Sequence, residues 1–156
     1  MAEGKKIKFL TPKGSLQATW EAILKTAGYR LSRSSRGYQP TVLNDEEIEM
    51  KMLRPQEIPN YLVGVNEGDI GITGLDWVKE TGQDVEVLLN LDAGTVRIVF
   101  AVPQSWKDVD SFDSFLEIFA KEGRELRIST EYINISLNFI MKSPVYKKYY
   151  GDTKPK

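Results

Sequence analysis

Two short stretches of this chain combine glycines with side chains that hold anions or hydrogen-bond a ligand. In the first, Lys13 and Gly14 lie between an apolar run and the start of a helical pattern. In the second, GDIGITG at residues 68–74, glycine occupies three of seven positions beside Asp69 and Thr73. Glycine lets a backbone approach a ligand closely, and free N–H groups at a helix start bind phosphate or carboxylate. These stretches predict an anion or nucleotide site built from backbone amides, a lysine, a carboxylate and a hydroxyl.

Each of these features also has an ordinary structural interpretation. Residues 68–74 fit a short buried strand that ends in a tight turn, and Lys13 fits a solvated turn lysine. Asp69 would then cap the turn and bind no ligand. Spacing alone leaves both interpretations open.

Composition excludes several classes of chemistry. The 156 residues include no cysteine and no histidine, which rules out disulfides, thiolate nucleophiles, histidine bases and ordinary zinc sites. The net charge of −1 gives no general electrostatic case for nucleic acid or an anionic membrane. No apolar run has the length of a membrane span or of a signal-peptide core, so we expect a cytoplasmic protein. Carboxylates, lysines, hydroxyls, backbone dipoles and Mg²⁺ brought by a phosphorylated substrate remain.

The elements that position the two stretches follow from apolar spacing. Apolar residues from Leu16 to Ala27 recur on one helical face, and Gly28 stands where that helix should end. Further helices are predicted at 58–65 and 76–81, and strands at 7–10, 47–52, within 68–74, at 85–91 and at 95–102. This alternation predicts an α/β domain with a mostly parallel sheet covered on both faces. Ligands of such sheets bind at the carboxyl ends of the strands, where both glycine-containing stretches fall.

The chain beyond Pro103 repeats the strand–turn–helix plan. Helical spacing at 112–119, an apolar run at 126–129 and helical spacing at 133–141 predict a helix, a strand and a helix. The tail, residues 146–156, has no apolar period, and these three elements alone should not bury a core. We therefore expect a first α/β domain at 1–102 and the beginning of a second, incomplete one at 103–156.

Four motifs, in order, resemble those of the ATP phosphoribosyltransferase family. They are PKGSL at 12–16, LRPQEIP at 53–59, GDIGITGLD at 68–76 and ISTEY at 128–132, and the resemblance runs from about residue 7 to 139. It implies a two-domain α/β fold similar to that of periplasmic binding proteins. It also implies the first reaction of histidine biosynthesis, in which N1 of the adenine of ATP joins C1 of the ribose of phosphoribosyl pyrophosphate. Pyrophosphate leaves with Mg²⁺ present, so positioning and charge neutralisation carry most of the catalysis.

The resemblance assigns roles on the first domain. Lys13 would neutralise a substrate phosphate, and Arg54 would hold a phosphate or a carboxylate, although a structural ion pair explains Arg54 equally well. The nucleotide side of the cleft would be lined by Gly14, Asp69, Gly71, Thr73 and Gly74.

On the second domain, Thr130 and Glu131 would face the cleft, with a helix cap as the alternative role of Thr130. No metal-ligating residue is assigned, because Mg²⁺ comes with the substrates. The expected partners are ATP and phosphoribosyl pyrophosphate, further copies of the chain, and a regulatory subunit.

Two departures from the family pattern limit what the resemblance carries. Ser15 stands where the family usually has arginine, so one phosphate contact is either missing or supplied by Arg33 or Arg36. Nothing in residues 139–156 matches the acidic Thr-Gly-Thr-type loop that grips phosphoribosyl pyrophosphate, so we expect this chain to be inactive alone. The alternatives are a solute-binding module and a regulatory paralogue that kept the scaffold without the reaction.

Overall fold

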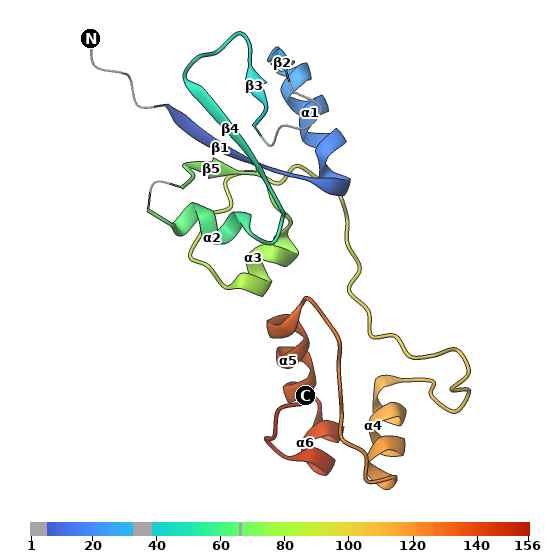
Figure 1. Cartoon of the computed structure of the whole chain (residues 1–156). Helices are drawn as coiled ribbons and strands as arrows, with labels where there is room; N and C mark the ends of the chain where they lie inside the picture. The colour runs from blue at the N-terminus through green and yellow to red at the C-terminus, as the bar shows by residue number, and fades with distance from the viewer. Residues whose placement is uncertain (1–5, 33–38, 66) are drawn as a thin grey trace. The chain divides into compact units, whose positions relative to one another are not determined.

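The fold is taken from a computed structural model that describes residues 6–32, 39–65 and 67–156. The chain divides into two compact units, Met1–Val96 and Arg97–Lys156, each of which is described by itself (Figure 1). The predicted domain boundary after residue 102 remains a prediction about the parent fold.

The first unit is built on a three-stranded parallel sheet. Its strands are β1 (Ile7–Pro12), β4 (Ile48–Leu53) and β5 (Ile70–Gly71), in the spatial order β4-β1-β5. Pro12 pairs with Leu53, and Leu10 pairs with Gly71. The prediction of a mixed α/β fold with a parallel sheet is confirmed. β1 runs two residues past the predicted strand, because its ladder with β4 continues to Pro12.

The helices of the first unit follow the predicted apolar spacing. Gly82, in the left-handed region at φ 62°, ends the helix that follows β5, as predicted. The described part of Arg30–Tyr38, for which the sequence allows a loop or an edge strand, forms β2 (Leu31–Ser32), which pairs antiparallel with β3 (Thr41–Val42). The helices are η1 (Gly14–Leu16), α1 (Gln17–Thr26), α2 (Ile58–Val63) and α3 (Leu75–Thr81).

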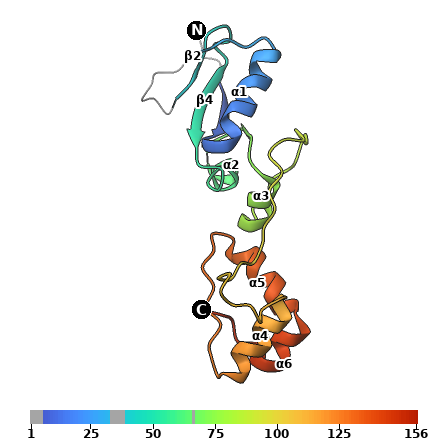
Figure 2. The ribbon, with the colours of Figure 1, turned by 90° about the vertical axis from the view of Figure 1, so that its right-hand side faces the viewer.

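Successive residues of β1 pack on opposite faces of the sheet. Leu10 lies in a cluster with Leu53 of β4 and Ile58 of α2. Phe9 packs on the other cluster, which is centred on Trp20 of α1. Figures 1 and 2 show α1 and α2 on the two sides of the sheet, so both faces are covered, as expected for parallel strands.

Residues 83–102 form neither helix nor strand, which corrects the strands predicted at 85–91 and 95–102. A strand is stable only when its backbone N–H and C=O groups pair in a ladder. The described residues supply no ladder partner to this segment. Alternating apolar residues alone are therefore insufficient to form a strand here. The segment exposes many large apolar side chains, namely Val87, Leu88, Leu89, Val96, Ile98, Val99, Phe100 and Val102.

The second unit buries a core of its own, contrary to expectation. It contains α4 (Phe112–Lys121), α5 (Ile133–Lys142) and α6 (Pro144–Tyr150), seen together in Figure 2. Residues 146–150, for which the sequence shows no apolar period, belong to α6, since Pro144 starts the helix and the Ser143 hydroxyl accepts from the Tyr146 amide. That helix completes a cluster of Leu116, Leu126, Ile140 and Tyr146, none more than 3% exposed. None of the helices in the described parts of the chain is long and apolar enough to cross a lipid bilayer.

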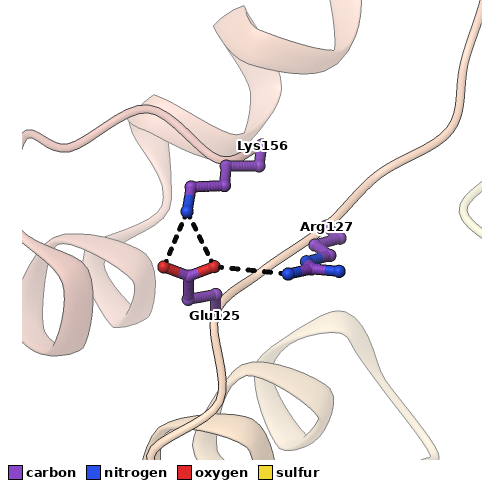
Figure 3. A network of polar contacts seen from close by, with 3 residues as sticks. All are labelled: Glu125, Arg127 and Lys156. Carbon is purple, nitrogen blue, oxygen red and sulfur yellow. Dashed lines mark hydrogen bonds and ion pairs between the residues drawn. The ribbon is translucent and has the colours of Figure 1, made fainter.

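The segment predicted as a strand at 126–129 makes one parallel rung instead of a full strand. The Ile128 N–H donates to the Lys156 carbonyl at 2.9 Å, and the Lys156 N–H donates to the Leu126 carbonyl at 3.0 Å. Beside this rung, the Lys156 ammonium bonds both carboxylate oxygens of Glu125 at 2.9 Å, and Arg127 lies at 3.7 Å (Figure 3). The hydrogen bond from Lys156 is the main cause that lowers the pKa of Glu125.

Candidate active site

Lys13 and Arg54 follow directly after two neighbouring parallel strands. The Lys13 N–H donates to the Leu53 carbonyl at 2.9 Å, and Pro12 pairs with Leu53, so the chain leaves β1 beside the residue that leaves β4. Neighbouring strands are about 4.8 Å apart. Lys13 is half-buried and Arg54 is exposed. The fold therefore brings the two predicted cationic residues to one edge of the sheet.

The turn after Lys13 leads through the short 3-10 helix η1 into α1. Gly14 has φ +83°, and no heavy atom lies within 4 Å of where a Cβ would stand, so backbone conformation rather than space requires glycine there. Lys13 precedes the first helical turn and makes no side-chain cap. The exposed Gly14 and Ser15 then lead into α1. Backbone N–H groups at a helix start can donate to a bound anion in place of a cap.

The β5–α3 turn is bonded to the turn that follows β4. The Thr73 hydroxyl donates to the Pro55 carbonyl at 2.8 Å, across 18 residues of sequence. The preceding residue, Ile72, donates its N–H to the Leu10 carbonyl at 3.0 Å and so extends the β1–β5 pairing. Gly74 is the residue before α3. Thr73 and Gly74 thus lie at the same carboxyl edge as Lys13 and Arg54.

Gly71, predicted to line the nucleotide cleft, lies against α2. A Cβ at Gly71 would stand 2.8 Å from Cγ2 of Ile58 and 3.4 Å from Cβ of Leu10. Glycine is therefore required here for the close packing of β5 on α2, whatever else it does. Its proposed contact with nucleotide remains a prediction.

Asp69 lies toward the opposite end of the sheet from Lys13. The Lys8 N–H donates to the Asp69 carboxylate at 2.8 Å, and the Asp69 N–H donates to the Lys8 carbonyl at 2.9 Å. Lys8 precedes Lys13 by five residues on β1, which is about 16 Å at the usual strand rise. The fold gives this carboxylate a structural partner and does not bring it to the edge that holds Lys13.

Thr130 and Glu131 belong to the second unit. The Thr130 hydroxyl accepts from the Tyr132 N–H at 2.9 Å, in the turn that precedes α5. Tyr132 is the residue that flanks the start of α5, and its side chain makes no capping bond, so both roles of Thr130 remain predictions. Both residues are exposed. Arg33 and Arg36, the suggested substitutes for a family arginine, lie outside the described residues.

Two residues that support this edge are not identified from the sequence. The Trp20 indole N–H donates to the Pro12 carbonyl at 2.8 Å, and a buried tryptophan N–H usually has such a partner. The carboxylate of Glu57 accepts from the Arg54 N–H at 3.1 Å. The spacing of Glu57, three residues after Arg54, resembles that of a capping box and is a usable signal. No spacing rule points from Trp20 to Pro12.

Comparison with known proteins agrees with the motifs. The family model described as HisG, ATP phosphoribosyltransferase, matches residues 54–150, which is more than half of the chain. The ATP phosphoribosyltransferase of Desulforudis audaxviator is 35% identical over 97% of this chain and 51% of its own length. That of Sulfolobus acidocaldarius is 38% identical over 87% of this chain and 45% of its own length. The chain therefore spans about half the length of the curated relatives it matches.

A solved structure supports the fold. It is that of an ATP phosphoribosyl transferase (HisG:HisZ) complex from Thermotoga maritima, and it aligns with a TM-score of 0.55 at 21% identity, over 85% of this chain and 69% of that chain. At this identity the likeness concerns the fold alone. From the family model and the curated relatives, the chain belongs to the ATP phosphoribosyltransferase family.

Proposed function

We propose that this chain carries the nucleotide-side half of an ATP phosphoribosyltransferase active site. The reaction joins N1 of the adenine of ATP to C1 of phosphoribosyl pyrophosphate and opens histidine biosynthesis. The observation that carries the proposal is the meeting of three turns at the carboxyl edge of the sheet. These turns hold Lys13 with Gly14, Arg54, and Thr73 with Gly74. The family membership of the chain supports the choice of reaction.

In this proposal the residues of the edge bind and orient phosphates. Lys13 and the amides after it neutralise one phosphate group at the start of η1. Arg54 binds a second anionic group with its guanidinium fork. Thr73 holds the Pro55 carbonyl, so that its own contribution is to fix the turn that carries Gly74. Charge neutralisation of this kind stabilises departure of pyrophosphate from the ribose.

The Mg²⁺ of this reaction would be held by substrate phosphates. Within the described residues, no three acidic side chains gather closely enough to enclose a metal ion. Phosphate oxygens supply hard ligands that Mg²⁺ prefers, and Lys13 and Arg54 would contact the remaining oxygens. Bound in this way, Mg²⁺ would supply positive charge beside the leaving pyrophosphate.

The wider organisation is proposed on the same basis. We infer a two-domain architecture like that of periplasmic binding proteins, with 1–102 and 103–156 contributing to the two sides and with Thr130 and Glu131 facing the cleft. A cytoplasmic location goes with the phosphorylated substrates.

The solved structure with the similar fold is a HisG:HisZ complex, which supports a partner subunit. The exposed apolar side chains of residues 87–102 support association of further copies, since such surface is usually covered.

Titration calorimetry with ATP tests the site. Lys13→Ala should weaken binding about tenfold or more, as expected for loss of a charged hydrogen bond. Lys25→Ala is the matched control, because Lys25 is an exposed lysine in the last turn of α1. Equal weakening in both variants would contradict the site. Steady formation of phosphoribosyl-ATP by the 156-residue chain would contradict the expectation that it holds only half of the catalytic residues.

A further inference from the structure

The peptide group between Pro12 and Lys13 is held from two sides. Its carbonyl oxygen, on Pro12, accepts the indole N–H of Trp20 at 2.8 Å. Its N–H, on Lys13, donates to the carbonyl of Leu53 at 2.9 Å. The first bond comes from α1 and the second from β4, so two different elements fix one peptide plane.

A peptide group is planar, and therefore two hydrogen bonds at its opposite ends fix the direction in which the chain leaves it. The next atoms belong to Lys13, with φ −80° and ψ 169°, and then to Gly14 at φ +83°. The side chain of Lys13 and the amides that follow it both start from this plane. A rotation of the plane would redirect all of them together.

The hydrogen bond from the Trp20 indole to the Pro12 carbonyl is buried away from solvent. Trp20 is 1% exposed, and Pro12 is among the residues below 2%. Water therefore has little access to replace the indole if the donor is removed. A buried carbonyl left without a donor is unfavourable, and this favours a shift of the turn toward some other donor.

We propose that Trp20 is a positioning residue for the anion-binding turn, and that its indole N–H sets the orientation of Lys13 and Gly14 toward substrate phosphate. This inference rests on the proposed function of that turn. Trp20 touches no substrate and acts through the Pro12 carbonyl. This positioning role explains why a side chain with an N–H group lies in this core. The other buried members of the cluster have aliphatic or thioether side chains, namely Leu24, Val42, Met50 and Met52.

The test compares a variant that removes the donor with one that removes packing. Trp20→Phe keeps a buried ring and deletes the N–H, whereas Leu24→Ala opens the same core cluster without touching the turn. With inorganic pyrophosphate as the probe for the whole chain, Trp20→Phe should bind about tenfold more weakly. Leu24→Ala should bind as the wild type does at a temperature where circular dichroism shows that it is folded.

Amide hydrogen exchange gives a second measurement, in which a ratio of two exchange rates should not change through a loss of global stability alone. The quantity to follow is the exchange rate of the Lys13 amide divided by that of the Ile72 amide. The Ile72 amide donates to the Leu10 carbonyl on the other side of β1 and serves as the internal reference. Trp20→Phe should raise that ratio about tenfold, and Leu24→Ala should leave it unchanged.

The outcomes separate this inference from the proposed function. If the wild type does not bind pyrophosphate, or if Lys13→Ala binds as tightly, the anion site is refuted and the role of Trp20 falls with it. If Lys13→Ala binds weakly but Trp20→Phe binds like the wild type, only the positioning role is overturned. A ratio that rises equally in Leu24→Ala would likewise overturn it.

Discussion

The hydroxyl of Thr73 donates a 2.8 Å hydrogen bond to the carbonyl of Pro55 and so joins the turn after β5 to the turn after β4. The family resemblance predicts that Thr73 touches nucleotide, and its side-chain donor is instead used to hold two turns of the site together. The candidate site is thus assembled by hydrogen bonds between loops as well as by strand pairing.

Replacing Thr73 by valine should lower the free energy of unfolding by about 1 kcal/mol, since the Pro55 carbonyl loses a partially buried donor. Thr73→Ser keeps the hydroxyl and should remain within about 0.5 kcal/mol of the wild type. Urea unfolding followed by circular dichroism measures both. Equal losses in the two variants would show that the methyl group, and not the hydrogen bond, carries the effect.

Gly71→Ala should destabilise the chain by about 1–3 kcal/mol, because the new methyl group would meet the Ile58 side chain at 2.8 Å. Gly64→Ala is a suitable comparison, as its Cβ would meet only the flexible Glu67 side chain, 3.3 Å away. Thermal unfolding of the two variants measures the difference. A stable Gly71→Ala that has lost only ATP binding would instead favour a direct ligand contact.

Thr11→Val should stabilise the first unit by about 1 kcal/mol, since it exchanges a buried hydroxyl for a methyl group. Thr11 is 0% exposed, and among the described residues its hydroxyl has no hydrogen-bond partner. The exposed Thr41 of β3 provides a control, and Thr41→Val should change stability little. A loss of stability in Thr11→Val would mean that the hydroxyl is satisfied in solution.

Alkaline titration should weaken the second unit above about pH 10. Burial raises the pKa of Tyr146 from its ordinary value of 10.0, and the neighbouring Tyr150 adds to the rise. Because the folded-state pKa is the higher one, this contribution to stability is complete below the unfolded pKa. It is then lost as the pH rises through the folded value.

Burial also raises the pKa of Tyr150, so absorbance of tyrosinate near 295 nm should show a late ionisation step that is smaller in Tyr146→Phe. The phenol of Tyr146 also donates to the carbonyl of Thr153, so that variant should loosen the tail as well. Tyr149→Phe should keep the late step. If the late step keeps its full amplitude in Tyr146→Phe, it does not include Tyr146.

Elements governed by local spacing are predictable. The apolar face of α1 and its end at Gly28, the proline in the first turn of α2, and the end of α3 at Gly82 all follow from interactions within a few residues. The alternation of these helices with strands is sufficient to predict a parallel sheet and the edge at which Lys13 and Thr73 lie.

Pairing between distant segments requires the tertiary structure. Residues 85–102 have strand-like spacing and yet form no ladder with the described residues, whereas residues 146–150 lack a clear apolar period and become a helix with a buried tyrosine. In both cases a partner elsewhere in the described chain, absent for the first and present for the second, decides the outcome. Local spacing contains no information about that partner.

The same limit applies to the site. Residue type and motif order are sufficient to select Lys13, Arg54 and Thr73, but not to show that Asp69 bonds Lys8, that Thr73 bonds Pro55, or that Trp20 holds Pro12. Each of these hydrogen bonds joins residues that only folding brings within reach. A polar side chain in a motif takes a ligand or a backbone group according to which of them the fold places beside it.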